Sequence, residues 1–176
     1  MNMIRAFNGK TPVIAESAFV SEAAYIVGDV EIGENASVWP GAVIRGDFGK
    51  ITIGIHTAVE DNCVIHSGTP SSPIGDVFIG NRVHIGHGAV LNCACIGDNV
   101  LIGMNATLLH DVIIGNRCVI GANCLVRQAM KVPDNSFVVG VPGKIKGPLS
   151  ADQEWWIEEA RNEYAKLARL YKAEGL

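Results

Sequence analysis

The sequence lacks the features that would place this chain in a membrane, in the secretory pathway or on nucleic acid. No run of about eighteen apolar residues is present, and the first ten residues, MNMIRAFNGK, contain no apolar signal core. The formal net charge of -4 provides no basic surface for DNA or RNA. We therefore expect a cytoplasmic protein with no nucleic-acid or membrane partner.

Paired cysteine motifs are also missing. The five cysteines are an odd number and form no CxxC pair, which argues against a disulfide framework and against a cysteine zinc site. They are Cys63, Cys93, Cys95, Cys118 and Cys124. A chain of 176 residues with 48% hydrophobic content is large enough for one core. We expect the cysteines to be reduced and to fill space in that core.

What the sequence does contain is an aliphatic residue at every sixth position over most of its length. The first run is Ile14, Val20, Ile26, Ile32, Val38 and Ile44; the second is Ile53, Val59 and Ile65; the third is Ile79, Ile85 and Leu91; the last is Ile96, Ile102, Leu108, Ile114, Ile120, Val126, Val132 and Val138. An amphipathic helix would need spacings of three and four, so this period excludes a helical bundle. It predicts a solenoid of short parallel strands in which each buried residue stacks on its counterpart in the next coil.

Glycine often follows the aliphatic residue, as in Ile79-Gly80 and Ile96-Gly97, and we expect it to permit tight turns between the strands. After GVPGKIKGP the composition changes. Ser150 and Gln153 form a capping-box pattern that predicts a helix. We expect a solenoid over 1–148 and a helix over 149–176 packed on it through one face, formed by Trp156, Ala160, Tyr164, Leu167 and Tyr171.

The six-residue phase breaks three times, all in the middle coils. Ile44 and Ile53 are separated by an insertion containing RGDFGK, Ile65 and Ile79 by one containing SGTPSSPIG, and the segment NCAC before Ile96 is one residue short. We expect the insertions to leave the solenoid as loops at its corners.

Four polar residues directly follow inward aliphatic residues and are expected to point outward: Arg45, Glu60, His66 and Asn92. When the two insertions are subtracted, Arg45, His66 and Asn92 fall one coil apart and should stack on one face. His87 belongs to the preceding corner, too far around the solenoid to meet His66 within one chain. A site that joins them needs a second subunit.

The hexapeptide pattern over about residues 11–146 resembles the left-handed β-helix family. Within it, VIRGD at 43–47, TAVEDNCVIH at 57–66, IGHGAVLNC at 85–93 and IGMNA at 102–106 resemble the γ-class carbonic anhydrases. The resemblance implies a homotrimer whose interface holds Zn²⁺, or another divalent metal such as Fe²⁺ or Co²⁺, through three histidines. His66 matches one ligand and His87 matches the ligand from the neighbouring subunit, while Asn92 stands at the third position.

The resemblance also assigns roles around the metal. Arg45 and Asp47 match residues that form an ion pair across the subunit interface. Glu60 occupies a position that is commonly glutamine and that holds the reactive hydroxide, and Asp61 follows it as in the family. The acidic proton-relay loop of the best-studied type has no counterpart in SGTPSSPIG.

Asn92 decides how much activity to expect. An amide oxygen is a harder and weaker donor than an imidazole nitrogen, and even the loss of a residue that supports a ligand costs about 10–100-fold in affinity or activity. We expect CO₂ hydration to be weak or absent. Glu60 could restore metal binding by direct coordination or act as a base for bound water, although an anionic ligand makes that water less acidic.

Other interpretations remain open. Outward histidines on a β-helix are usually surface residues, and we expect this of His56, His84 and His110, with His84 as an alternative third ligand. A hexapeptide-repeat acyltransferase, with His110 as its base, is the competing enzyme interpretation. A non-catalytic trimeric module for assembly or interaction is the third, and the lost ligand favours it.

Overall fold

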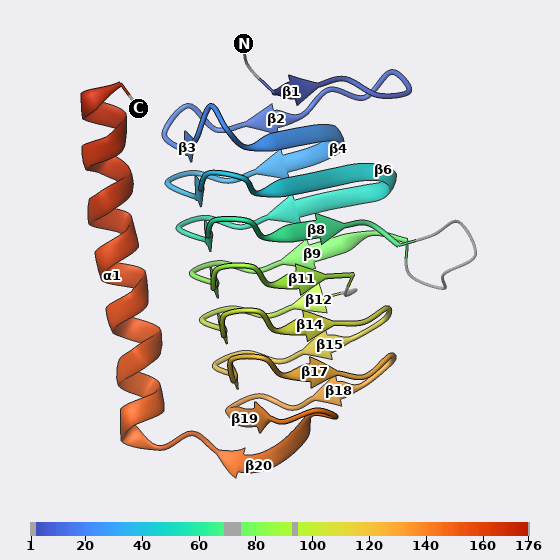
Figure 1. Cartoon of the computed structure of the whole chain (residues 1–176), viewed down its shortest axis with the longest axis vertical. Helices are drawn as coiled ribbons and strands as arrows, with labels where there is room; N and C mark the ends of the chain where they lie inside the picture. Colours follow the sequence, from blue (N-terminus) through green and yellow to red (C-terminus); the bar gives the residue numbers. More distant parts are fainter. Residues whose placement is uncertain (1–2, 69–74, 93–94, 176) are drawn as a thin grey trace.

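The computed structural model describes residues 3–68, 75–92 and 95–175, and the side chains of all of these except 160–162. It is a left-handed parallel β-helix with one long helix, α1 (Ala151–Glu174), at its C-terminal end, as predicted (Figure 1). Short strands repeat around three flat faces, and within the coils each strand pairs in parallel with its counterpart in the neighbouring coil.

The three faces are defined by their strands. Face one contains β3 (Phe19–Val20), β5 (Ser37–Val38), β7 (Ala58–Val59), β10 (His84–Ile85), β13 (Leu101–Ile102), β16 (Val119–Ile120) and β19 (Ser136–Val139). Face two contains β1 (Ile4–Arg5), the first halves of β4 (Tyr25–Ile32) and β6 (Val43–Ile53), β8 (Val64–His66), β11 (Val90–Leu91), β14 (Thr107–Leu108) and β17 (Leu125–Val126). Face three contains β2 (Val13–Ile14), the second halves of β4 and β6, β9 (Val77–Ile79), β12 (Cys95–Ile96), β15 (Ile113–Ile114) and β18 (Lys131–Val132).

The core consists of the residues that the six-residue phase predicted to point inward. Parallel pairing stacks them in one column per face; on face three the column is Ile14, Ile32, Ile53, Ile79, Ile96, Ile114 and Val132. Apart from Ile14 and Val20, which are partly buried, every residue of the four predicted runs is buried. A continuous apolar column therefore passes through the whole solenoid and supplies its main stabilisation.

The first phase break is not a loop. The insertion between Ile44 and Ile53 was expected to leave the solenoid, but β6 continues through it as one strand of eleven residues beside β4. The chain can follow the corner because Gly46 lies against the preceding coil, where a Cβ atom would be 2.3 Å from the carbonyl oxygen of Asp29. Most of the second insertion, 69–74, and residues 93–94 of the shortened segment, which include Cys93, lie outside the described residues.

The glycines that follow the inward residues have a different role from the one expected. A Cβ atom at Gly80 would lie 2.6 Å from the carbonyl oxygen of Gly97 in the next coil, so these glycines allow neighbouring coils to approach. The left-handed backbone conformation of the corners is carried two residues later, often by asparagine, as at Asn99, Asn105 and Asn123.

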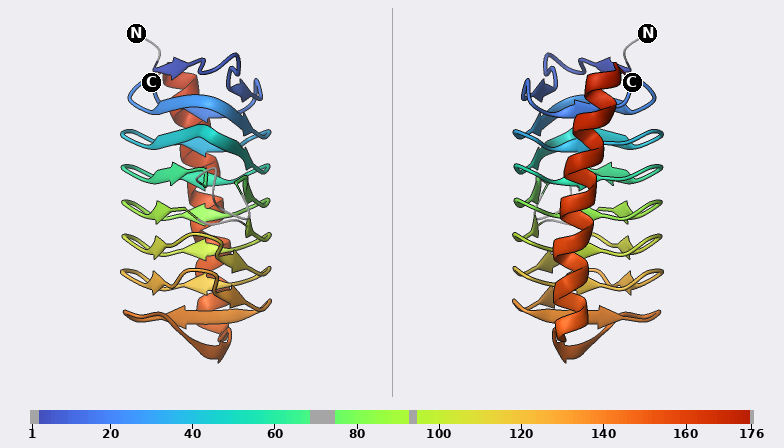
Figure 2. Two further views of the ribbon diagram at one scale, coloured as in Figure 1. Left: turned by 90° about the vertical axis from the view of Figure 1, so that its right-hand side faces the viewer. Right: turned by 90° about the vertical axis from the view of Figure 1, so that its left-hand side faces the viewer.

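Helix α1 runs along face one for the length of the solenoid (Figure 2). It begins at the predicted capping box, in which Ser150 and Gln153 hydrogen-bond to each other's backbone amides. Its buried side is formed by Ile157, Tyr164, Ala168 and Tyr171, and the last three pack with Phe19 and Trp39.

The prediction was wrong for two members of that stripe, because Trp156 and Leu167 are 46% and 38% exposed. The buried side of α1 instead includes Ile157 and Ala168, which directly follow Trp156 and Leu167. The side chain of Ala160, a third predicted member, lies outside the described part of the chain. β20 (Lys144–Pro148) precedes the helix. The division of the chain into two units, 1–148 and 149–176, remains a prediction.

β20 pairs antiparallel with β19, whereas the strands of the coils pair in parallel. At the opposite end a short bridge between Phe7 and Lys10 folds the chain back beside β1. Among the described helices, none has the length and apolar character needed to span a bilayer.

Candidate functional site

The predicted column of outward residues exists at the corner between faces two and three. Arg45 is aligned with His66 in the β6–β8 pair, and Ile65 is aligned with Leu91 in the β8–β11 pair. Asn92, which directly follows Leu91, is therefore the neighbour of His66 in the next coil. The stacking predicted from the phase breaks is confirmed.

His66 lies against a charged pair at this corner. Its Nε2 atom is 2.7 Å from Oδ1 of Asp47 and 3.2 Å from Nη2 of Arg45, and Nη1 of Arg45 is 3.4 Å from Oδ2 of Asp47. The ring of Phe48 covers one side of the imidazole, with centroids 5.5 Å apart. Arg45 and Asp47 thus orient His66 within one subunit, and an ion pair across an interface remains a prediction.

Asn92 contains an orphaned polar atom. Its Oδ1 is buried and has no hydrogen-bond partner among the described residues. A buried acceptor without a partner costs about 1–3 kcal/mol, so native proteins usually satisfy it. This unpartnered oxygen belongs to the residue that follows His66 in the column of outward side chains.

The second cluster lies at the corner between faces one and two, around the carboxylate of Glu60. Oε1 of Glu60 is 2.5 Å from Nε2 of His84, while Oε2 accepts a 2.7 Å hydrogen bond from the His87 backbone amide and is 3.2 Å from Nε2 of His87. Asp61 contacts the other side of the same imidazole, with Oδ2 3.0 Å from Nδ1 of His87. Tyr164 of α1 completes the cluster, with its hydroxyl 3.2 Å from His87 Nε2.

Glu60 is only 2% exposed although it points out of the solenoid, because α1 covers it. Burial raises the pKa of this carboxyl, but the hydrogen bond and charge of His84, together with Tyr164 and His87, outweigh burial and hold the pKa below its ordinary value. The same packing raises the pKa of Tyr164, chiefly by burial and then through Glu60. The cluster therefore holds an ionised carboxylate beside a neutral phenol.

The expectation that His84 is a surface residue was wrong. It is 6% exposed, its ring packs against Tyr164 with centroids 4.8 Å apart, and its Nδ1 is buried without a partner among the described residues. The reason is that β10 lies on face one, which α1 covers. The sequence signal that could have indicated this is the predicted helix itself, since outward residues on the face that it covers become buried. His56 is exposed, as expected, and His110 is partly buried.

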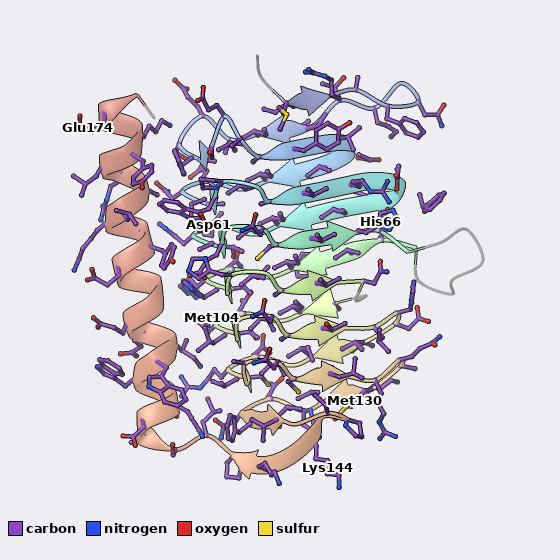
Figure 3. All side chains as sticks on the ribbon, viewed as in Figure 1. Asp61, His66, Met104, Met130, Lys144 and Glu174 are labelled. Carbon is purple, nitrogen blue, oxygen red and sulfur yellow. The ribbon has the colours of Figure 1, made fainter. Side chains whose placement is uncertain are left out.

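The two clusters are at different corners of one chain, as predicted for His66 and His87. Figure 3 shows Asp61 on the side of the solenoid nearer α1 and His66 on the side away from it. Among the described residues of one chain, no three histidine, cysteine or carboxylate side chains are arranged to hold a metal ion. The residues named by the resemblance therefore lie in two separate clusters, one around His66 and one around Glu60 and His87.

A groove of about 440 Å³ opens between α1 and face one, with the Glu60 cluster at one end. Its walls are mostly apolar and include Leu101, Met104, Val119, Trp155 and Trp156. The Glu60 cluster thus adjoins a space that small molecules can enter from solvent.

Comparisons with known proteins agree with the fold. The family described as bacterial transferase hexapeptide (six repeats) matches residues 11–46 and 96–128. A probable carbonic anhydrase from Methanocaldococcus jannaschii is 46% identical over 163 residues, which cover 92% of this chain and 99% of that protein. The chain belongs to the γ-class carbonic-anhydrase-like proteins of the hexapeptide-repeat family.

Other relatives extend this result. A carbonic anhydrase from Geobacillus kaustophilus is 39% identical and is covered to 92%. The chain spans about 60% of the length of the mitochondrial gamma carbonic anhydrases 1 and 2 of Arabidopsis thaliana that it matches. Among solved structures, a putative acetyltransferase from Bacillus cereus has a TM-score of 0.91 at 36% identity, with 98% of both chains covered.

Proposed function

We propose that this chain forms a γ-class homotrimer in which His66 of one subunit and His87 of the next bind a divalent metal, with Asn92 at the third position. The observation that carries the proposal is the division of the motif residues into two half-sites at the two ends of face two. A threefold arrangement that turns face two inward places the His66 corner of one subunit beside the His87 corner of its neighbour.

The residues present fit a divalent ion in that arrangement. The available donors are two imidazole nitrogens and one unpartnered amide oxygen, a set that suits Zn²⁺, Fe²⁺ or Co²⁺. In the γ-class relatives a metal of this kind is expected to supply a Lewis acid that makes water nucleophilic at neutral pH. Because one imidazole is replaced by an amide, we infer weak CO₂ hydration or none.

Each side chain around the two half-sites has a definable task. Asp47 and Arg45 fix the orientation of the His66 ring, and Asp61 fixes the His87 ring through Nδ1, which leaves Nε2 directed toward Glu60. The ionised carboxylate of Glu60 is the candidate base for water at this corner. The apolar groove favours an uncharged substrate such as CO₂ over ions.

Two other functions remain as alternatives. The structural similarity to a putative acetyltransferase and the apolar groove under α1 favour an acyltransferase, but His110 has no side-chain partner among the described residues that would orient it as a base. A trimer without catalysis, used for assembly or interaction, is favoured by the missing third histidine.

Metal binding by mixed trimers tests the proposal. His66→Ala and His87→Ala trimers should each bind less than a tenth of the Co²⁺ that wild type binds, since each lacks one half-site. When the two variants are dissociated and reassembled together, some interfaces combine an intact His66 with an intact His87 and should regain binding. Co²⁺ binding that is unchanged in the double variant would disprove the shared site, and acetyl-CoA binding without metal would favour the acyltransferase.

A further inference from the structure

The carboxylate of Glu60 is a group beside His87 that can bind a metal and that the three-histidine pattern does not use. It is buried, yet it lines the groove beside His87. A buried carboxylate is costly unless neighbouring groups satisfy it. Here His84 and the His87 backbone amide each hydrogen-bond to a different oxygen of Glu60. These two hydrogen bonds stabilise the negative charge at this corner.

The geometry of the pair formed by Glu60 and His87 is that of adjacent ligands. Oε2 of Glu60 and Nε2 of His87 are 3.2 Å apart. Two donors that each lie about 2.0–2.2 Å from one divalent ion are separated by about this distance. No large movement of either side chain is then needed for both atoms to contact the same ion.

Asn92 makes such a ligand necessary. With Asn92 at the third position, the site formed by His66 and the neighbour's His87 would have two nitrogens and a neutral amide oxygen. A carboxylate oxygen binds divalent ions more strongly than an amide oxygen, because it carries charge. Two histidines and one carboxylate form a donor set that holds both catalytic zinc and non-haem ferrous iron in proteins.

We propose that Glu60 coordinates the metal beside His87 and that His84 is the residue that positions it. This inference rests on the proposed trimer and its shared metal site. Nε2 of His84 holds Oε1 of Glu60 and leaves Oε2 directed toward His87, while Tyr164 packs on the His84 ring and fixes it in turn. The site then has a two-histidine, one-carboxylate ligand set divided between subunits, with the amide oxygen of Asn92 at its edge.

Titration of the metal-free trimer with Co²⁺ tests Glu60, with affinity and the visible absorption of the bound ion as readouts. Glu60→Gln keeps the size of the side chain and removes its charge, so it should weaken Co²⁺ binding by at least about tenfold and change the spectrum. Glu159→Gln is the matched control, because Glu159 lies on the same groove but is exposed and contacts neither histidine. Circular dichroism and sedimentation establish that each variant keeps the wild-type fold and assembly.

A second pair of variants tests the positioning role of His84. His84→Ala should weaken Co²⁺ binding without abolishing it, because the carboxylate remains but is no longer held. His84→Gln supplies an amide N–H to Glu60 and should restore most of the affinity. A purely structural role would make both variants lose stability without this recovery in affinity.

The outcomes separate this inference from the proposed function. Wild-type affinity and spectrum in Glu60→Gln, with binding still dependent on His66 and His87, would overturn the role of Glu60 and leave the shared site intact. Binding that depends on Glu60 but not on His66 would support the ligand and overturn the shared site. A wild-type trimer that binds no Co²⁺ would overturn both.

Discussion

At the scale of single residues, Asn92 is the substitution with the largest chemical consequence. Its side chain lies next to His66 in the column, and its oxygen has no partner among the described residues. An imidazole at this position would add a nitrogen donor to the His66 half-site. Catalytic zinc sites use three protein ligands and keep one position open.

Asn92→His is therefore expected to raise zinc affinity by at least about tenfold. CO₂ hydration should rise most in Asn92→His/Glu60→Gln, since removal of the carboxylate keeps the fourth position open for water. Competition titration and stopped-flow hydration assays measure the two effects. Asn92→Leu is the control that fills the same space without a donor. If wild type hydrates CO₂ as fast as the variants, Asn92 is no defect, and Glu60 or His84 has taken the third position.

Cys63 gives a prediction of pH dependence. Burial raises the pKa of its thiol from 9.0 to about 12, and the thiol donates a hydrogen bond to the carbonyl oxygen of Gly86. The folded chain holds this proton more tightly than the unfolded chain. Its contribution to stability is thus fully present below about pH 9 and is lost as the pH rises toward 12.

The free energy of unfolding in urea, measured from pH 7 to pH 11 for wild type and Cys63→Ala, checks this. The stability advantage of wild type should shrink above about pH 9. Labelling supplies a second readout, because the buried thiol should react with iodoacetamide only on unfolding. An advantage that stays constant over the whole range would contradict the assignment.

At the scale of elements, the attachment of α1 depends on a few aromatic contacts. Tyr171 packs edge-on against both Phe19 and Trp39, with centroids 5.7 and 5.1 Å away. Tyr171→Ala should reduce the free energy of unfolding by about 2–3 kcal/mol. Leu170→Ala is the control, since Leu170 is 61% exposed and should change stability by less than about 0.5 kcal/mol. Urea unfolding followed by tryptophan fluorescence measures both, and equal losses would mean that α1 docks through another side.

The elements also show what the sequence could and could not predict. The inward columns and the Arg45, His66 and Asn92 stack were predictable, because the coil repeat fixes which residues are neighbours. The continuous β6 was missed, since an insertion in the phase does not reveal whether the backbone keeps its pairing. The pairing of Glu60 with His84 was missed because it depends on burial by a helix that is distant in sequence. The buried side of α1 was predicted one residue off at two places, because helical spacing does not decide between Trp156 and Ile157 or between Leu167 and Ala168.

At the scale of the whole molecule, face two is the surface through which subunits are expected to meet. Val90 is exposed in β11, on the stretch of chain between His87 and Asn92. Sedimentation equilibrium should give three times the chain mass of 18.7 kDa. Val90→Arg should shift the protein toward monomers, because it places charge in the interface.

Phe78→Arg is the matched control, since Phe78 is an exposed apolar residue of β9 on face three. It should leave the trimer intact. Dissociation by Phe78→Arg and not by Val90→Arg would mean that face three forms the interface, and a wild-type monomer at micromolar concentration would remove the basis for a shared site.

The antiparallel strand β20 has a consequence for how long such an assembly can become. A stack of parallel coils presents unpaired backbone groups at its last rung, and an identical stack could add there without limit, as in a fibril. β20 reverses direction on β19 and leads directly into α1. Its outer edge no longer matches the start of another solenoid. Growth by end-to-end addition is thereby blocked at this end, so association is directed to the sides of the molecule, where a small closed ring can form.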